Sequence, residues 1–258
     1  MTSSNCFRGA LPASVGHALF AATLIGIGIT GLVTGRFASI WQSVPPGVPA
    51  RRALVYLCAC VSLACGAGLL FKRSFAAAAR VLFAYLLLWL LLVKGFYIVG
   101  APTVEVNYQS AGETAVLVAG AWVLYAWAAG GNGVRPARAL YALALVAFGL
   151  SHFAYLGLTA PLVPAWLPRH VFWAYFTGGA YLAAAAAMLT GVWARLAAAL
   201  SALQMGLFTL LVWAPLAVTG HLAAGQWGEF GVSWALTAAA CVVVDSLRGI
   251  PWLAVGKR

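Results

Sequence analysis

The stretch AAAARVLFAYLLLWLLLVKGFYIV, residues 76–99, decides the fold class. Arg80 and Lys94 are its only charged residues. A helix needs about 20 predominantly apolar residues to cross the hydrocarbon core of a bilayer. Lipid offers the backbone N–H and C=O groups no partner, so a long apolar run of this kind must form a helix. We therefore interpret residues 76–99 as a transmembrane helix.

The rest of the chain has the same character. Hydrophobic residues make up 64% of the 258 positions and charged residues only 7%, whereas an average soluble domain carries roughly 25% charged residues. No separate water-soluble catalytic domain fits between the apolar runs. The sequence predicts an all-α polytopic membrane protein with eight transmembrane helices, at about 14–35, 52–71, 76–99, 113–129, 137–157, 171–190, 195–218 and 230–247.

The distribution of basic residues predicts the orientation of these helices. The formal charge of +11 would suggest a nucleic-acid partner in a soluble protein. Here, ten basic residues fall on the side of the two termini and four on the other side, with Lys94 inside a span. Basic residues favour the cytoplasmic side. We therefore expect both termini in the cytoplasm, contacts with membrane lipids, and no nucleic-acid partner.

Two similar segments indicate an internal duplication. VPPGVPAR at 44–51 lines up with VPAWLPRH at 163–170, and Gly112-Glu113 lines up with Gly228-Glu229. Each half has an even number of spans, so both halves enter the membrane from the same side. We expect two tandem four-helix bundles in parallel orientation, with a first unit at 1–130, a linker at 131–136, and a second unit with a short interfacial tail at 137–258.

The second unit carries the more specific motifs. Gly149-Leu150-Ser151-His152-Phe153 is followed by LVPAWLP at 162–168 and by WAYFTGGA at 173–180. Over about 137–247 this half resembles the DoxX-like family of bacterial membrane proteins. The resemblance implies a four-helix unit in the bacterial inner membrane. It also implies a link to quinone-linked oxidation of sulfur compounds or to membrane-associated redox complexes. The first unit has Leu32-Val33-Thr34 in place of Leu150-Ser151-His152, so a site built on this histidine should occur once per chain.

His152 and Glu229 are the candidate catalytic residues. A titratable side chain in lipid is costly without a partner. If the first and last helices of the unit are neighbours, His152 and Glu229 meet in its outer half, where the carboxylate would orient the imidazole for proton transfer. A structural role, with His152 bonded to a backbone carbonyl, is the alternative. Further candidates for the rim of a binding site are Ser151, Tyr155, Trp166, His170, Trp173, His221 and Trp227.

Three other polar features have structural interpretations. Lys94 and Glu113 are expected to form an ion pair between neighbouring helices, with Ser110-Ala111-Gly112-Glu113 as a capping box. Asp245 and Arg248, at the end of the last span, are expected to interact. The histidines and cysteines have no spacing typical of a metal or haem site, so we expect neither zinc nor haem.

Three functions remain open. The first is a membrane subunit of a quinone-linked redox system, with a quinone or another apolar small molecule bound in the outer half of the second unit. The second is a non-catalytic scaffold for a protein partner in a redox or secretion system. The third is a small-molecule carrier, which the duplication favours but the scarcity of charge near mid-membrane does not. Whether the protein is an enzyme stays undecided at this point.

Overall fold

The computed structural model describes residues 14–44, 47–131, 133–223 and 226–256. Arg8, Pro45, Pro46, Asn132, Lys257 and Arg258, on which parts of the topology and duplication arguments depend, lie outside these ranges. Within the described ranges the regular structure is helical throughout. Eight helical segments are long and apolar enough to cross a membrane. The prediction of an all-α, multi-pass membrane protein is therefore confirmed.

The eight spans follow the predicted order along the chain. Two of them contain a five-residue π-helical segment, η2 (Leu90–Lys94) and η4 (Thr209–Trp213), each of which is continued by a short α-helix. The spans are α1 (Val15–Thr34), α2 (Arg51–Leu69), α3 with η2 and α4 (Phe75–Gly100), α5 (Glu105–Ala128), α6 (Val134–Ala154), α8 (His170–Thr190), α9 with η4 and α10 (Ala194–Val218) and α11 (Gln226–Asp245).

The fourth span differs most from the prediction, because α5 begins at Glu105 and not near residue 113. The predicted capping box is wrong, since Ser110 lies inside this helix. The predicted span at 113–129 leaves out the polar first turns of α5. They are accommodated because their side chains find partners: the Asn107 amide donates to the carbonyl oxygens of Tyr97 and Ala101, at 3.1 and 3.2 Å.

Helices of the two halves begin at a constant spacing. The π-helices and the spans before them start 119 residues apart, as Val15 and Val134, Arg51 and His170, Phe75 and Ala194, and Leu90 and Thr209. Ala50 and Arg169, also 119 residues apart, are both left-handed residues that precede a helix. This spacing supports the predicted duplication. With this spacing, however, Glu229 corresponds to Ser110. The predicted equivalence of Glu229 and Glu113 therefore disagrees with the spacing of the helices.

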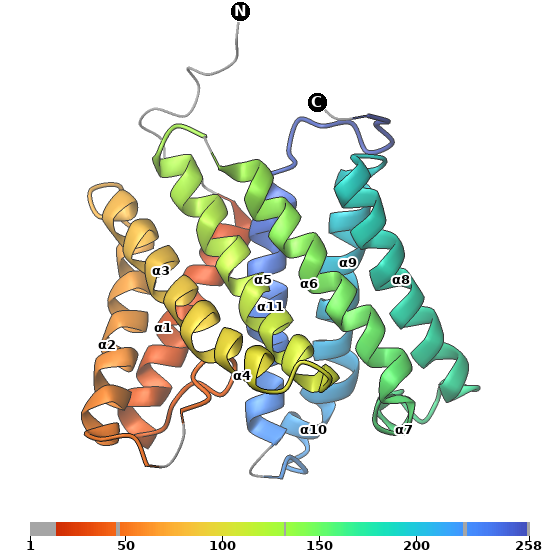
Figure 1. The fold of residues 1–258 in the computed structure, drawn as a ribbon, viewed down its shortest axis with the longest axis horizontal. Coiled ribbons are helices and arrows are strands. Elements are labelled where there is room, and N and C mark those ends of the chain that lie inside the picture. Colours follow the sequence, from red (N-terminus) through yellow and green to blue (C-terminus); the bar gives the residue numbers. More distant parts are fainter. Residues whose placement is uncertain (1–13, 45–46, 132, 224–225, 257–258) are drawn as a thin grey trace, which may run out of the picture.

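The two halves share their last helices. The last helix of each half packs against the first helix of the other half: α5 packs against α6, and α11 packs against α1. The helices α5 and α11 lie side by side in the centre of the molecule (Figure 1). Gly120 of α5 packs against Ala239 of α11, and these two positions are again 119 residues apart. A residue that contacts its own counterpart lies on a twofold axis. The axis that relates the two halves therefore runs between α5 and α11.

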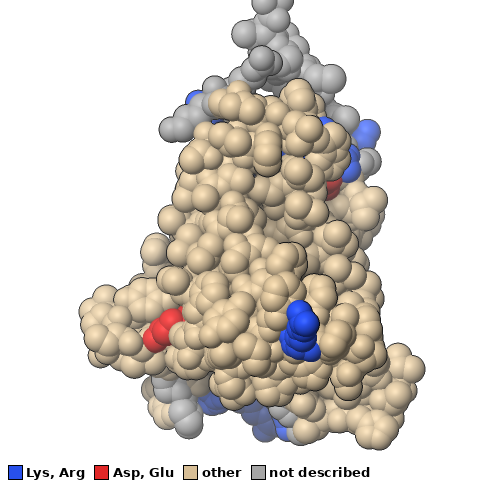
Figure 2. Space-filling model, turned by 90° about the vertical axis from the view of Figure 1, so that its right-hand side faces the viewer, with Lys and Arg blue, Asp and Glu red and all other residues tan. Residues whose placement is uncertain are grey.

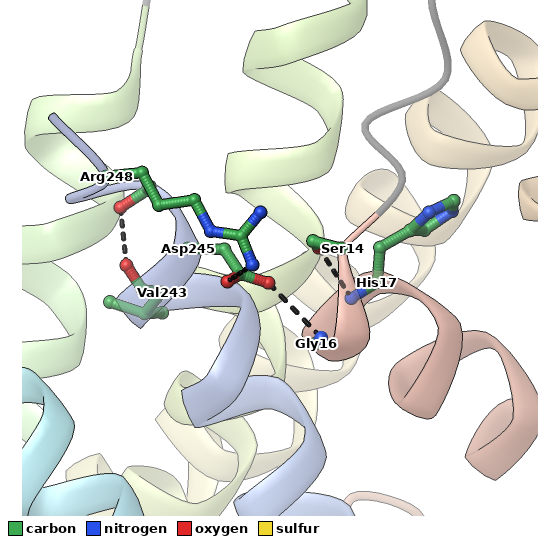
Figure 3. Close-up of polar contacts among 7 residues, drawn as sticks. Ser14, Gly16, His17, Val243, Asp245 and Arg248 are labelled. Carbon is green, nitrogen blue, oxygen red and sulfur yellow. Dashed lines mark hydrogen bonds and ion pairs between the residues drawn. The ribbon is translucent and has the colours of Figure 1, made fainter.

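Both described ends of the chain lie at one end of the bundle, which we call the terminal end (Figure 1). Here the Asp245 carboxylate of α11 accepts from the Gly16 N–H in the first turn of α1 at 3.2 Å, and Arg248 forms the expected ion pair with it at 2.7 Å (Figure 3). Ser14 caps α1 by accepting from the His17 N–H. The opposite end, where α4, α7 (Leu156–Thr159) and α10 (Ala214–Val218) lie, we call the distal end.

Candidate functional site

His152 lies between α6 and α8 in the distal half of the second unit. Its Nδ1 is 2.8 Å from the Phe148 carbonyl oxygen, and its ring centroid is 5.6 Å from that of Tyr181. A carbonyl can only accept, so Nδ1 carries the proton and Nε2 of the neutral ring is an acceptor. The backbone contact is the one expected for a structural histidine, but it leaves Nε2 available to a ligand.

Close packing of α6 and α8 holds the imidazole in this place. Gly149 of α6 faces the carbonyl oxygen of Gly178, where a Cβ would lie 2.9 Å from it. Conversely, a Cβ at Gly178 would lie 2.8 Å from Cβ of His152. Small residues of this kind let transmembrane helices approach closely. Gly149 and Gly178 therefore have a packing role that determines where the histidine lies.

Glu229 is not brought to His152. It lies in the first turn of α11 and is exposed, whereas the described contacts of His152 come from α6 and α8. Its electrostatic neighbour is Glu113 of α5. The reason is the exchange of helices between the halves, because α6 packs against α5 and α8 and has little contact with α11. The orienting role of Glu229 toward His152 stays a prediction that no described hydrogen bond supports.

A different carboxylate, Glu105, lies next to the predicted site. Ser151 is buried and its hydroxyl donates to Oε1 of Glu105 and to the Ala147 carbonyl oxygen. Tyr155, one turn further along, accepts from the Val106 N–H at 3.2 Å. The second carboxylate oxygen of Glu105 is buried and has no hydrogen-bond partner among the described residues. The predicted span at 113–129 leaves Glu105 outside the helix, so this residue was not among the predicted site residues.

The aromatic and histidine rim candidates lie at the distal end but face outward. Trp166 in the loop before α8 is 69% exposed and Trp227 of α11 is 52% exposed. Trp173 is half-buried and stacks edge-on against Phe172 and Phe176 of its own helix. His170 begins α8 and His221 is exposed. No described contact joins these residues to His152, so their role at its rim stays a prediction.

The first half contains a buried polar cluster that sequence reasoning missed. Residues 35–44, which we call the plug, leave α1 and turn back into the bundle, so that Ile40, Trp41 and Gln42 are at most 5% exposed. The Gln42 amide donates to the Tyr85 hydroxyl, and Thr114 donates to the Ile40 carbonyl oxygen at 3.4 Å. Non-helical backbone at membrane depth is tolerated where protein surrounds it. The plug therefore closes the distal end of the first half.

Lys94 binds the plug and does not form the predicted ion pair with Glu113. Its ammonium donates to Ser43 at 2.9 Å and to Ser110 at 2.7 Å, and the side chain is 2% exposed. Glu113 lies within electrostatic range of Lys94, but no ion pair between them is present in the described part of the chain. The hydroxyls of the plug and of α5 occupy the positions nearest to the ammonium. Lys94 therefore serves as a clamp on the plug.

The described residues contain no group of three or more His, Cys, Asp or Glu side chains that could hold a metal ion. Comparison of the chain with known protein families, with curated proteins and with solved structures finds no match.

Proposed function

We propose that the protein is a membrane subunit of a quinone-linked redox system in the bacterial inner membrane. In this proposal the quinone head group binds in the distal half of the second unit, with the distal end on the outer side of the membrane. The resemblance of the second half to DoxX-like proteins suggests the class of ligand. The observation that carries the proposal is the difference between the distal ends of the two halves.

The first half is closed by the plug, and the second half has no counterpart to it. The residues 119 positions after the plug form α7 and the short 3₁₀ helix η3 (Ala160–Leu162), neither of which contains a buried residue. His152 is the titratable group near this end of α6. A ligand that entered the second half here would take the place that protein side chains take in the first half.

The polar groups near α6 are suited to the quinol form of a quinone head group. Reduction of a quinone to a quinol takes up two electrons and two protons, and both forms exchange hydrogen bonds with their site. Nε2 of His152 and the unpartnered Glu105 oxygen can accept from the hydroxyl groups of the quinol, and an imidazole can transfer a proton. The electrons would be exchanged with a partner redox protein.

The surface of the protein supports access from the membrane. The face in Figure 2 has a middle band without charged side chains, and the Lys, Arg, Asp and Glu side chains visible there lie toward its two ends. Large apolar side chains such as Tyr175 and Phe176 of α8 are exposed on the molecule, at 45% and 54%. An apolar molecule dissolved in the bilayer would reach the second half through this surface.

Quinone extraction from the purified protein tests the proposal. The full chain would be purified in mild detergent, and its quinone content measured by chromatography per mole of protein. We expect about one quinone per chain for the wild type and much less for His152→Ala at equal membrane abundance. A wild-type protein that carries no quinone under conditions that retain its lipids would contradict the proposal.

The scaffold function is the second candidate. The exposed Trp166 and Trp227 at the distal end favour it, since tryptophan is enriched at protein interfaces. A stoichiometric protein partner that co-purifies without quinone, and is lost on Trp166→Ala, would support the scaffold in place of the quinone site.

A further inference from the structure

Trp213 is a buried hydrogen-bond donor without an acceptor. It ends the π-helix η4, its side chain is 5% exposed, and its indole Nε1 has no hydrogen-bond partner among the described residues. A buried polar group that has lost its hydrogen bonds to water costs about 1–3 kcal/mol. The lipid around the protein offers no acceptor either. A buried donor without an acceptor indicates that a bound molecule supplies the acceptor in the functional state of the protein.

The neighbours of Trp213 fix its depth in the second half. One turn earlier, the Thr209 hydroxyl is 2.6 Å from that of Ser233 on α11. Since α9 and α11 run in opposite directions, Trp213 lies one turn beyond this contact toward the distal end, at the level of Glu229 on α11. Phe208 packs edge-on against the indole ring, with centroids 5.9 Å apart. The indole is therefore held near the distal end, where the second half has no plug.

The corresponding position in the first half shows which hydrogen-bond acceptor Trp213 lacks. Lys94, 119 residues before Trp213, also ends a π-helix and is also a buried donor. Its two acceptors are the hydroxyls of Ser110 and of Ser43, which belongs to the plug. In the second half the position of Ser43 is taken by Leu162, whose side chain cannot accept a hydrogen bond. Glu229, at the position of Ser110, forms no hydrogen bond with Trp213 among the described residues.

We propose that the Trp213 indole N–H donates a hydrogen bond to a carbonyl oxygen of an apolar ligand bound in the distal half of the second unit. The ligand oxygen takes the role that the plug hydroxyl of Ser43 has toward Lys94. Because an indole is only a donor, the ligand must present an acceptor at this point. The inference rests on the proposed function for the identity of the ligand as a quinone, whose acceptor is a carbonyl oxygen, but the requirement for a hydrogen-bond acceptor comes from Trp213 itself.

Equilibrium binding to the full chain in lipid nanodiscs tests this inference. The probes are a short-chain alkyl-1,4-benzoquinone, the alkylbenzene with the same chain, which lacks the carbonyl groups, and a dialkyl ketone. Trp213→Phe removes the N–H and keeps an aromatic ring. Trp234→Phe is the matched control, because the Trp234 N–H already has an acceptor, the Thr23 hydroxyl at 3.0 Å.

We expect Trp213→Phe to weaken benzoquinone binding about five- to tenfold, which corresponds to one hydrogen bond. It should leave alkylbenzene binding unchanged, and Trp234→Phe should behave as the wild type. Equal benzoquinone affinity of the wild type and Trp213→Phe would overturn the role of Trp213 and leave the proposed function standing. An equal loss for both benzoquinone and alkylbenzene would also overturn it, because packing would then explain the effect.

The two proposals fail in different ways. Binding of the ketone but not of benzoquinone, with the ketone weakened by Trp213→Phe, would overturn the quinone function and support the role of Trp213. A wild type that binds neither carbonyl probe would overturn both. If Trp213→Phe does not fold, Trp213→His keeps a ring N–H, and it should retain a preference for benzoquinone over alkylbenzene. Loss of that preference in folded Trp213→His would count against the inference.

Discussion

The two halves of the molecule have the same helical frame but are closed in different ways. In the first half, the plug brings Trp41 and Gln42 into the bundle, and Lys94 binds its end through Ser43. In the second half, the equivalent residues form two short helices without a buried residue, and Trp213 and His152 each keep one ring nitrogen without a described hydrogen bond. The difference shows that one helical frame can end in a buried loop in one half and in short helices without a buried residue in the other.

The strongest test of this contrast compares tryptophans of the two distal loops. Trp41→Ala removes a side chain that is 0% exposed, whereas Trp166→Ala removes one that is 69% exposed. We expect Trp41→Ala to lower the free energy of unfolding by about 3–5 kcal/mol, the range for truncation of a buried large aromatic. Trp166→Ala should change it by less than about 0.5 kcal/mol. Denaturant titration in detergent measures both, and similar effects would mean that the plug does not hold the first half together.

A second test concerns the glycine contact that places His152. A Cβ at Gly178 would lie 2.8 Å from Cβ of His152, while a Cβ at the neighbouring Gly179 would have no atom within 4 Å. Gly178→Ala should therefore force α6 and α8 apart and cost about 1–3 kcal/mol of stability. Gly179→Ala should be neutral. If the two variants unfold at the same denaturant concentration, the close approach of α6 and α8 does not determine where the histidine lies.

Quinone content distinguishes the polar groups of the two halves. His152→Ala should lower the affinity for the reduced form, the quinol, about tenfold, as expected for the loss of one hydrogen bond of about 1.4 kcal/mol to Nε2, and the amount of bound quinol should fall with it. Lys94→Ala, in the first half, should lower stability but leave the quinone content per folded protein unchanged. Chromatography of the extracted lipids gives this ratio. The reverse pattern would place the ligand in the first half.

The smallest effect is expected where the halves meet at the terminal end. Asp245 caps α1 and binds Arg248, but its counterpart 119 residues earlier is Ala126, which has no charge to offer α6. Asp245→Asn keeps a side-chain oxygen for the Gly16 N–H and removes the charge, so we expect a loss of about 0.5–1 kcal/mol. Arg248→Ala should cost less, since the Arg248 side chain is 57% exposed. A larger effect of Arg248→Ala in denaturant titration would reverse these roles.

The spans could be predicted from the sequence because lipid imposes a length and an apolar composition on each one. The plug could not, because residues 35–50 contain three prolines, two glycines and four scattered polar residues and look like an ordinary loop. The adjacent large apolar residues Ile40 and Trp41 were the available signal that this loop is buried. The start of α5 was missed for a related reason, since its polar first turns are paired with groups on other segments.

The candidate site was only partly predictable. His152 and Ser151 could be singled out because polar groups in a span need partners, but the partner depends on which helices are neighbours. The sequence does not show that α6 packs against α5, so Glu105 was missed and Glu229 was given its place. Trp213 was missed because a tryptophan inside an apolar run looks like core, and its unpartnered N–H can be recognised only from the packing around it.

The contact of α11 with the first half also affects how the protein can be made. Chains fold from the N-terminus as they are synthesised, yet α1 packs against α11, the eighth of the described spans in chain order. Gly228 of α11 lies against Ser39 of the plug, where a Cβ would be 3.1 Å from the Ser39 hydroxyl oxygen. The first three spans must therefore stay in the membrane without this contact until α11 has been synthesised. A chain cut after the seventh span would leave its N-terminal half exposed to membrane quality-control proteases.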